Sequence, residues 1–272
     1  MIVFPNCKIN LGLNILGKRP DGYHNLQTVF YPLPLFDVLE AIQHSKNDVE
    51  LLLSGIEIEG QPEKNLCLKA YRLLKNDFPQ LSSIKICLHK AIPAGAGLGG
   101  GSADGAFMLM LLNDKFKLNL PQEKLIDYAL ALGSDCPFFI INKPCFAQQR
   151  GEFIETISLD LSGYELVLLN PGIHVNTGWA FRQVNFSKSN TIKAVIQQPV
   201  ETWKEQLIND FELPVFEKYP EIKNIKDYLY QNGALYASMS GSGSSVYGIF
   251  NKKINIDNVF FPSHYFIKQL VL

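Results

Sequence analysis

The stretch Pro93-Ala94-Gly95-Ala96-Gly97-Leu98-Gly99-Gly100-Gly101-Ser102-Ala103 contains five glycines among its eleven residues. The segment before it, 83–90, alternates apolar and polar residues, as a half-buried strand does. The segment after it, 103–112, is apolar and contains helix-forming residues. The glycines therefore form a loop from a strand to a helix, and Ser102 stands where the N-cap of that helix is expected.

This glycine loop suits an anion. The first backbone N–H groups of a helix have no partner within the helix, and the helix dipole adds partial positive charge there. Glycines let the backbone approach phosphate oxygens without a Cβ in the way. The pattern predicts phosphate binding, with a tight glycine turn that holds no ligand as the alternative.

Two well-known nucleotide loops do not fit this stretch. Gly95 and Gly100 have the spacing of a Walker A loop, but Gly101 stands where that loop needs lysine. The letters also fit the GxGxxG of a dinucleotide fold. However, the loop lies far from the N-terminus, and no clear strand ending in an acidic residue follows at the distance that fold requires. The sequence therefore predicts a third kind of nucleotide loop.

Length and composition narrow the class of protein. The chain of 272 residues can form one large domain or two small ones, and 47% hydrophobic with 19% charged residues is ordinary for a globular protein. A net charge of −1 does not suggest nucleic-acid or membrane-surface binding. The apolar runs are too short to span a bilayer, and the N-terminus lacks a signal-peptide pattern. Five cysteines without a CxxC pair make disulfides and zinc unexpected, which favours the cytoplasm.

The N-terminal segment predicts a strand hairpin. Residues 7–15 alternate like a strand and place Lys8, Asn10, Gly12 and Asn14 on the face opposite the apolar one. A second strand, 23–30, follows a turn and begins with Tyr23 and His24. A solvated strand face and a structural histidine are the alternatives to a ligand site here.

Two further segments bear on a site. Asn65 is predicted to cap a helix over 66–77, which local evidence favours over ligand contact. Asp135 lies in a turn between a helix over 122–132 and a wholly apolar strand over 138–141, where an ordinary turn aspartate is the alternative.

A second glycine-serine loop, 240–245, lies between two short strands. It is therefore predicted to be a hairpin turn that packs against the first loop. One helix over 214–230 precedes it. A change in character near residues 150–165 predicts a domain boundary, which divides the chain into 1–155 and 156–272.

Taken together, these motifs resemble the GHMP small-molecule kinases, a superfamily that includes galactokinase, homoserine kinase and mevalonate kinase. The resemblance runs in order through Lys8-Ile9-Asn10, Asp21-Gly22-Tyr23-His24, the glycine loop, Gly133-Ser134-Asp135 and Ser240-Gly241-Ser242-Gly243. It implies an α+β fold of two domains with the active site in the cleft between them. The N-terminal domain, 1–155, would be ribosomal protein S5 domain 2-like and carry the ATP loop. The C-terminal domain, 156–272, would be a ferredoxin-like α/β sandwich.

The resemblance also implies roles for individual residues. Asp135 would be the general base, and Lys8 beside it would keep that carboxylate ionised and offset charge on the transferring phosphoryl group. The glycine loop, from Pro93 to Ala103, would cradle the ATP phosphates, while Asn65 and Lys90 would contact the adenosine. Mg²⁺ would bridge the phosphates with few protein ligands and several waters. The implied substrate-binding residues are Asn10, Tyr23, His24, Thr177, Phe181, Gly241 and Ser242.

Within the superfamily, the motifs are closest to the kinases of non-mevalonate isoprenoid synthesis. The implied activity is ATP-dependent phosphorylation of the 2-hydroxyl of a methylerythritol that carries a cytidine diphosphate group. Tyr23 and Phe181 would lie on either face of the cytosine. A homoserine or mevalonate type of kinase, or a non-catalytic nucleotide-binding regulator, are the alternatives. A monomer or weak homodimer is expected. Gly105 departs from the family's alanine-rich helix start. Glycine there costs about 1 kcal/mol of helix stability relative to alanine.

Overall fold

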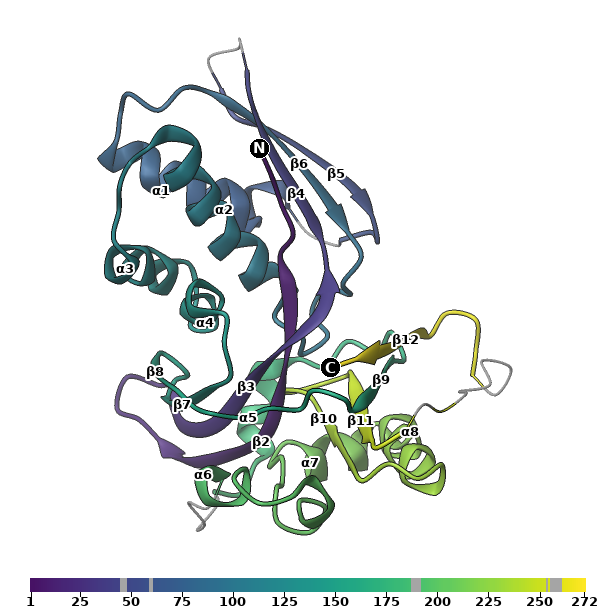
Figure 1. Ribbon diagram of the computed structural model, residues 1–272. Coiled ribbons are helices and arrows are strands. Elements are labelled where there is room, and N and C mark those ends of the chain that lie inside the picture. Colours follow the sequence, from purple (N-terminus) through teal and green to yellow (C-terminus); the bar gives the residue numbers. More distant parts are fainter. Residues whose placement is uncertain (45–47, 59–60, 187–191, 253, 255–260) are drawn as a thin grey trace. The chain divides into compact units, whose positions relative to one another are not determined.

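The computed structural model describes residues 1–44, 48–58, 61–186, 192–252, 254 and 261–272 (Figure 1). It divides the chain into two compact units, each of which is described by itself. Unit 1 comprises Met1–Cys7, Leu35–Ala94 and Gly99–Lys143. Unit 2 comprises Lys8–Pro34, Gly95–Leu98 and Pro144–Leu272.

These units differ from the predicted division into 1–155 and 156–272. Strands β2 (Asn6–Lys18) and β3 (His24–Phe36) join β7 (Cys145–Gln149) and β8 (Phe153–Thr156) in one sheet with the order β2-β3-β7-β8. Because strand pairing joins segments that are far apart along the chain, a single cut in the sequence does not separate the compact units.

Unit 1 contains a second sheet with the order β1-β4-β6-β5, in which β4 and β6 are antiparallel and β5 and β6 are parallel. Its four helices gather on one side of this sheet (Figure 1). The predicted strand before the glycine loop is confirmed as β6, whose apolar side chains are buried. The elements are β1 (Ile2–Val3), β4 (Val38–Gln43), β5 (Glu50–Gly55), β6 (Ile84–Lys90), α1 (Leu66–Asp77), α2 (Gly100–Phe116), α3 (Gln122–Leu132) and α4 (Cys136–Ile141).

Helix α1 begins as the sequence predicts. Asn65 is its N-cap, and its Oδ1 accepts a hydrogen bond from the backbone N of Cys67 at 2.9 Å. The start of α1 packs against α2 at Gly105, where an added Cβ would lie 2.8 Å from the Cβ of Leu66. The glycine that departs from the family pattern thus lets the two helices approach closely.

We expect Gly105→Ala to destabilise the protein by about 1–3 kcal/mol, because overpacking outweighs the gain in helix propensity. Urea unfolding of the two proteins measures the difference in the free energy of unfolding. An increase in stability would show that helix propensity dominates at this position and that the approach of Leu66 is readily relieved.

Three predicted elements are wrong in detail. Helix α2 begins at Gly100 with Gly99 as N-cap, so Ser102 lies inside its first turn rather than at the cap. The apolar run expected as a strand is helix α4, because short apolar runs do not distinguish a strand from a buried helix. The single helix expected over 214–230 is two helices, α7 (Glu212–Lys218) and α8 (Pro220–Gln231), since Pro220 cannot continue α7.

Unit 2 adds an antiparallel sheet with the order β10-β11-β9-β12, and α8 packs against its strands β10 and β11 (Figure 1). The core beside it joins buried side chains of β2, β9, β11 and α8. The second glycine-serine loop connects β10 to β11 as a hairpin, which confirms that prediction. The remaining elements are β9 (Glu165–Asn170), β10 (Tyr236–Met239), β11 (Val246–Phe250), β12 (Phe266–Val271), α5 (Thr177–Gln183) and α6 (Ile192–Val195).

Candidate active site

The two glycine loops touch within unit 2. The Oγ of Ser240 donates a hydrogen bond to the carbonyl oxygen of Gly97 at 2.8 Å. The backbone N of Ser245 donates to the carbonyl oxygen of Ala96 at 3.2 Å. Gly97 has φ +79°, and an added Cβ would lie 2.0 Å from the Ser240 carbonyl oxygen. The predicted packing of the second loop against the first is therefore confirmed, and it requires glycine at position 97.

The glycine loop ends at the N-terminus of α2. Gly99 adopts the left-handed region with φ 70° and ψ 12°, and the helix begins at the next residue. The loop therefore delivers the unpaired N–H groups of a helix of 17 residues. This is the geometry in which helix N-termini bind phosphate.

Changing Gly99 to valine should weaken ATP binding at least tenfold, because a branched side chain is strained at positive φ and would intrude on phosphate oxygens. Calorimetry with ATP measures the affinity. Gly163→Val is the matched control, since Gly163 also has positive φ, at +88°, and its added Cβ meets no atom within 4 Å. Unchanged affinity in Gly99→Val would move the phosphate site away from this loop.

Asp135 lies next to the start of α2 within unit 1. The Cys136 thiol is hydrogen-bonded to the side chain of Ser102, in the first turn of α2. Burial raises the pKa of this thiol to about 12, the Ser102 bond lowers it, and the charge of Asp135 raises it. Asp135 occupies the N-cap position of α4, yet its carboxylate does not cap that helix. Asp135 is therefore a partly exposed residue that directly precedes α4, a helix packed against α2.

Lys8 is held rigidly in unit 2. Its Nζ donates to the Oδ1 of Asn10 at 2.6 Å and to the carbonyl oxygen of Gly97 at 3.3 Å, and it lies 4.9 Å from the Phe30 ring centroid. Asn10 in turn donates through Nδ2 to the Oγ1 of Thr28 at 3.0 Å. Lys8 is only 3% exposed, so this strand face is a buried polar network and not the solvated face that was the alternative.

The network extends to Tyr247, Ser240 and Asn209, to which the sequence assigned no role in the site. The Tyr247 hydroxyl donates to the Asn10 carbonyl oxygen at 2.7 Å, and Ser240 accepts from the Asn10 backbone N at 3.2 Å. Asn209, which belongs to an Asn-Asp pair before α7, donates to the Gly241 carbonyl oxygen at 2.8 Å. The sequence signals near these contacts were the hairpin position of the second loop and the motif that begins at Ser240. They join Asn10 and Gly241, both predicted substrate-binding residues.

The predicted cytidine-binding residues form separate ring contacts in unit 2. The His24 and Phe181 rings are stacked, with centroids 4.6 Å apart and planes 13° from parallel. The other contact joins the half-exposed Tyr23 to Arg150, whose guanidinium lies 4.6 Å from the ring centroid. Burial, and secondly the charge of Lys18, lower the pKa of His24. The stacked partner of Phe181 in this structure is His24, which differs from the expected arrangement around a base.

The last two substrate candidates also meet. The hydroxyls of Thr177, at the start of α5, and Ser242, in the second loop, lie 2.8 Å apart. Both side chains are accessible at the surface of unit 2. They place a pair of hydroxyl groups where α5 and the second loop come together.

Lys90 differs from its expected role at the adenosine. Its ammonium is 2% exposed and pairs with two buried carboxylates, those of Asp37 and Asp104. A side chain held in this way has no surface to offer a nucleoside. Asn65 is half-exposed at the N-cap of α1, one residue before the close approach to α2.

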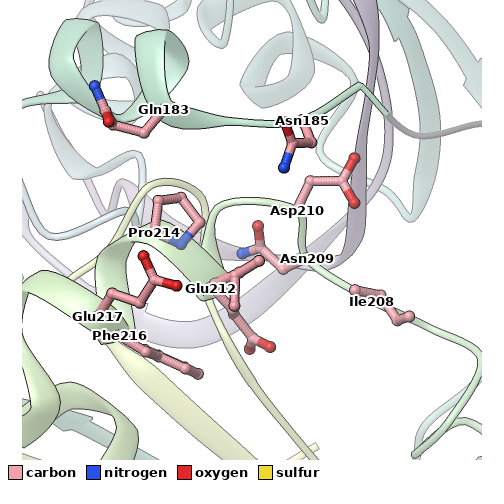
Figure 2. Close-up of a pocket in the computed structure, with 10 residues that line it drawn as sticks. Gln183, Asn185, Ile208, Asn209, Asp210, Glu212, Pro214, Phe216 and Glu217 are labelled. Carbon is pink, nitrogen blue, oxygen red and sulfur yellow. The ribbon is translucent and has the colours of Figure 1, made fainter.

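A cavity of about 530 Å³ lies elsewhere in unit 2, between the end of α5 and α7 (Figure 2). None of the predicted site residues lines it. The Asp210 carboxylate at its wall accepts a hydrogen bond from the Ile15 backbone N at 2.7 Å, and burial raises the pKa of this carboxyl. Its lining residues are Gln183, Asn185, Ile208, Asn209, Asp210, Glu212, Leu213, Pro214, Phe216 and Glu217.

The described ranges contain neither a metal-binding cluster nor a membrane-spanning helix. Within those ranges, no three His, Cys, Asp or Glu side chains are grouped so that they could hold a metal ion. No helix there has the length and apolar character needed to cross a bilayer.

Comparison with known proteins defines the class. Residues 65–143 match the model of the GHMP kinases N-terminal domain, and residues 191–261 match that of the GHMP kinases C-terminal domain. A solved mevalonate kinase from Methanococcus jannaschii shares the fold with a TM-score of 0.70 at 12% identity, covering 100% of this chain and 98% of its own. The glycine loop at a helix start is therefore that of a GHMP-type small-molecule kinase.

More similar relatives define the family. The 4-diphosphocytidyl-2-C-methyl-D-erythritol kinase of Bacteroides fragilis is 54% identical over 97% of both chains, and that of Cytophaga hutchinsonii is 50% identical over 93% of both. A crystal structure of 4-(cytidine 5'-diphospho)-2C-methyl-D-erythritol kinase matches with a TM-score of 0.80 at 30% identity, covering 92% of this chain and 90% of its own. The chain belongs to the 4-diphosphocytidyl-2-C-methyl-D-erythritol kinase family.

Proposed function

We propose that this protein transfers the γ-phosphoryl group of ATP to the 2-hydroxyl of 4-diphosphocytidyl-2-C-methyl-D-erythritol. The observation that carries the proposal is the glycine loop that ends at the N-terminus of α2, with α4 packed against that helix and Asp135 directly before α4. The start of α2 thus has backbone donors for phosphate, and a carboxylate precedes the helix that packs against α2. The identity of the acceptor substrate is inferred from the names of the relatives.

The chemistry needs a base and charge neutralisation. The acceptor oxygen forms a bond to the γ-phosphorus while the bond from that phosphorus to the β–γ bridging oxygen breaks, and ADP leaves. Asp135 takes the proton from the acceptor hydroxyl. Lys8, oriented by Asn10 and Gly97, offsets charge on the transferring group.

The nucleotide binds as its magnesium complex, with Mg²⁺ entering as part of the co-substrate. The N–H groups at the start of α2 support this role, because they are donors for the phosphates that would carry the ion. Phosphate oxygens and water would then supply most of the ligands, as is usual for Mg²⁺. Asn65, at the start of α1, contacts the adenosine.

The cytidine end binds in unit 2. Burial and the charge of Lys18 lower the pKa of His24, so its imidazole is neutral at pH 7 and carries one donor and one acceptor for the edge of a cytosine. Phe181 and Tyr23 provide aromatic faces, and the Thr177–Ser242 hydroxyl pair supplies further polar contacts. Asn10 and Gly241 contact the methylerythritol end.

One assay separates this function from the alternatives. The protein is incubated with ATP and Mg²⁺ together with the diphosphocytidyl substrate, and in parallel with mevalonate or homoserine. We expect ADP release only with the diphosphocytidyl substrate. Turnover of mevalonate or homoserine would identify another kinase of the superfamily, and ATP binding without turnover of any acceptor would identify a regulator. We propose that the enzyme is cytoplasmic. We also propose that it is a monomer or weak homodimer, and light scattering measures this oligomeric state.

A further inference from the structure

Three buried charges meet in unit 1 next to the glycine loop. Asp37 precedes β4, Lys90 ends β6, and Asp104 follows the first turn of α2. Their exposed fractions are 0%, 2% and 3%. The Lys90 Nζ donates to the Oδ2 of Asp37 and, at 2.7 Å, to the Oδ2 of Asp104. We call these residues the loop triad.

The loop triad fastens the entry to the glycine loop. The Oδ1 of Asp37 accepts hydrogen bonds from the backbone N of Ala91 at 2.6 Å and of Ile92 at 2.9 Å. These are the two residues that leave β6 just before Pro93. Both backbone donors are thereby fixed to the carboxylate that also holds Lys90.

The same ammonium fastens the exit. Through Asp104 it holds the second turn of α2, and the first residue of that helix, Gly100, lies directly against it. A Cβ at Gly100 would be 3.4 Å from the Lys90 Nζ and 3.0 Å from the Cγ2 of Ile92. The residues that lead into the loop and those that follow it are therefore both anchored at the Lys90 ammonium, the former through Asp37 and the latter through Asp104.

We propose that the loop triad sets the shape of the glycine loop for ATP, so that Asp37, Lys90 and Asp104 are positioning residues of the nucleotide site. The proposal rests on the proposed kinase function. Donors aimed at phosphate lose much of their effect when they are misplaced by about an ångström. A loop with several glycines has little rigidity of its own, which makes its anchors decisive.

Electrostatics argue against a purely structural role. The groups that face the Asp104 carboxylate are Lys90 and Asp37, and the Cys67 thiol donates to the Asp104 carbonyl oxygen at 3.5 Å. Burial raises the pKa of Asp104 to about 7, Lys90 lowers it and Asp37 raises it. Its Oδ1 is buried without a hydrogen-bond partner in the described part of the chain. A neutral side chain would serve packing alone better than this carboxylate does.

The raised pKa of Asp104 determines how the stability of the folded protein changes with pH. Between the ordinary value of 3.8 and about 7, the unfolded chain has lost the Asp104 proton while the folded protein keeps it. Stability therefore falls as pH rises through this range, and the loss is complete above it. Asp104→Asn removes this titration, so its melting temperature should rise relative to that of the wild type between pH 5 and pH 8.

The test measures ATP binding directly. Calorimetry with ATP is performed on full-length wild type, Lys90→Met, Asp37→Asn and Asp104→Asn, each checked by a thermal melt. We expect the Kd for ATP to rise about tenfold or more in Lys90→Met and Asp37→Asn, and less in Asp104→Asn, which keeps an acceptor oxygen for Lys90. The Kd for ATP of Asp104→Asn, measured by calorimetry across pH, should lack the inflection near pH 7 that we expect for the wild type.

The control is Asn113→Ala, at the opposite end of α2. Asn113 clamps that end through the backbone N of Leu120 at 2.9 Å, so its loss destabilises the same helix without touching the loop. Its Kd for ATP should equal that of the wild type. Folded triad variants with unchanged ATP affinity would overturn the proposal. If Lys90→Met does not fold, Asp104→Asn decides: a Kd for ATP whose pH profile runs parallel to that of the wild type overturns the proposal. ATP affinity needs no acceptor, so this result is independent of the substrate assay.

Discussion

Replacing Asp135 by asparagine should lower kcat by about 10²–10⁴-fold, the usual contribution of a general base. Asparagine keeps the shape of the side chain but cannot accept the proton from the acceptor hydroxyl. The Kd for ATP should barely change, because the proposed nucleotide site is the loop and the start of α2. Steady-state kinetics with the diphosphocytidyl substrate, read beside calorimetry with ATP, measure both effects.

The matched control is Asp127→Asn, on the helix that precedes Asp135. Asp127 is an exposed carboxylate whose pair with Lys124 spans 3.4 Å, and its loss should leave kcat unchanged. If Asp135→Asn kept more than a third of wild-type turnover while Asp127→Asn was neutral, Asp135 would be excluded as the base. A loss of ATP affinity equal to the loss of kcat would instead assign Asp135 to nucleotide binding.

Local signals in the sequence predicted the helix starts that are set by neighbouring residues, and the two glycine loops. The Asn65 side chain satisfies an N–H of α1 from within the same segment, so the start of that helix is readable from a few residues. Helix α3 spans the predicted 122–132, with Pro121 before it. The two glycine loops stood out by composition, and the hairpin between β10 and β11 fixed the second one.

Contacts between distant segments were not readable in this way. The lysine at the end of β6 looks the same in the sequence whether it faces a nucleoside or two buried carboxylates, and those acids lie 53 and 14 residues away along the chain. Lys8 and Asn10 alternate with apolar residues as a solvated face would, yet they lie in a buried network completed by Ser240 and Tyr247. Alternation reports the period of a strand and not whether water or protein covers its polar face.

The specificity prediction concerns Phe181 and His24. Phe181→Ala should raise the KM for the cytidyl substrate about 5- to 150-fold, since stacking a base on an aromatic ring contributes roughly 1–3 kcal/mol. The KM for ATP should change little, because we propose that the nucleotide binds in the glycine loop. His24→Ala should also raise the KM for the cytidyl substrate, by removing hydrogen bonds to the base edge.

The stacking of His24 on Phe181, with ring centroids 4.6 Å apart, adds a sharper expectation. Each ring orients the other, so the double variant should raise the KM for the cytidyl substrate by less than the product of the two single effects. Phe181 also packs edge-on against the buried Phe211 at 4.9 Å, so some thermal stability will be lost as well. Tyr228→Ala controls for that loss, because Tyr228 is half-buried in the same unit and contacts Phe261 in the same edge-on manner at 4.9 Å. A Phe181→Ala variant that melts earlier, as Tyr228→Ala should, but keeps its KM for the cytidyl substrate would make Phe181 a core residue only.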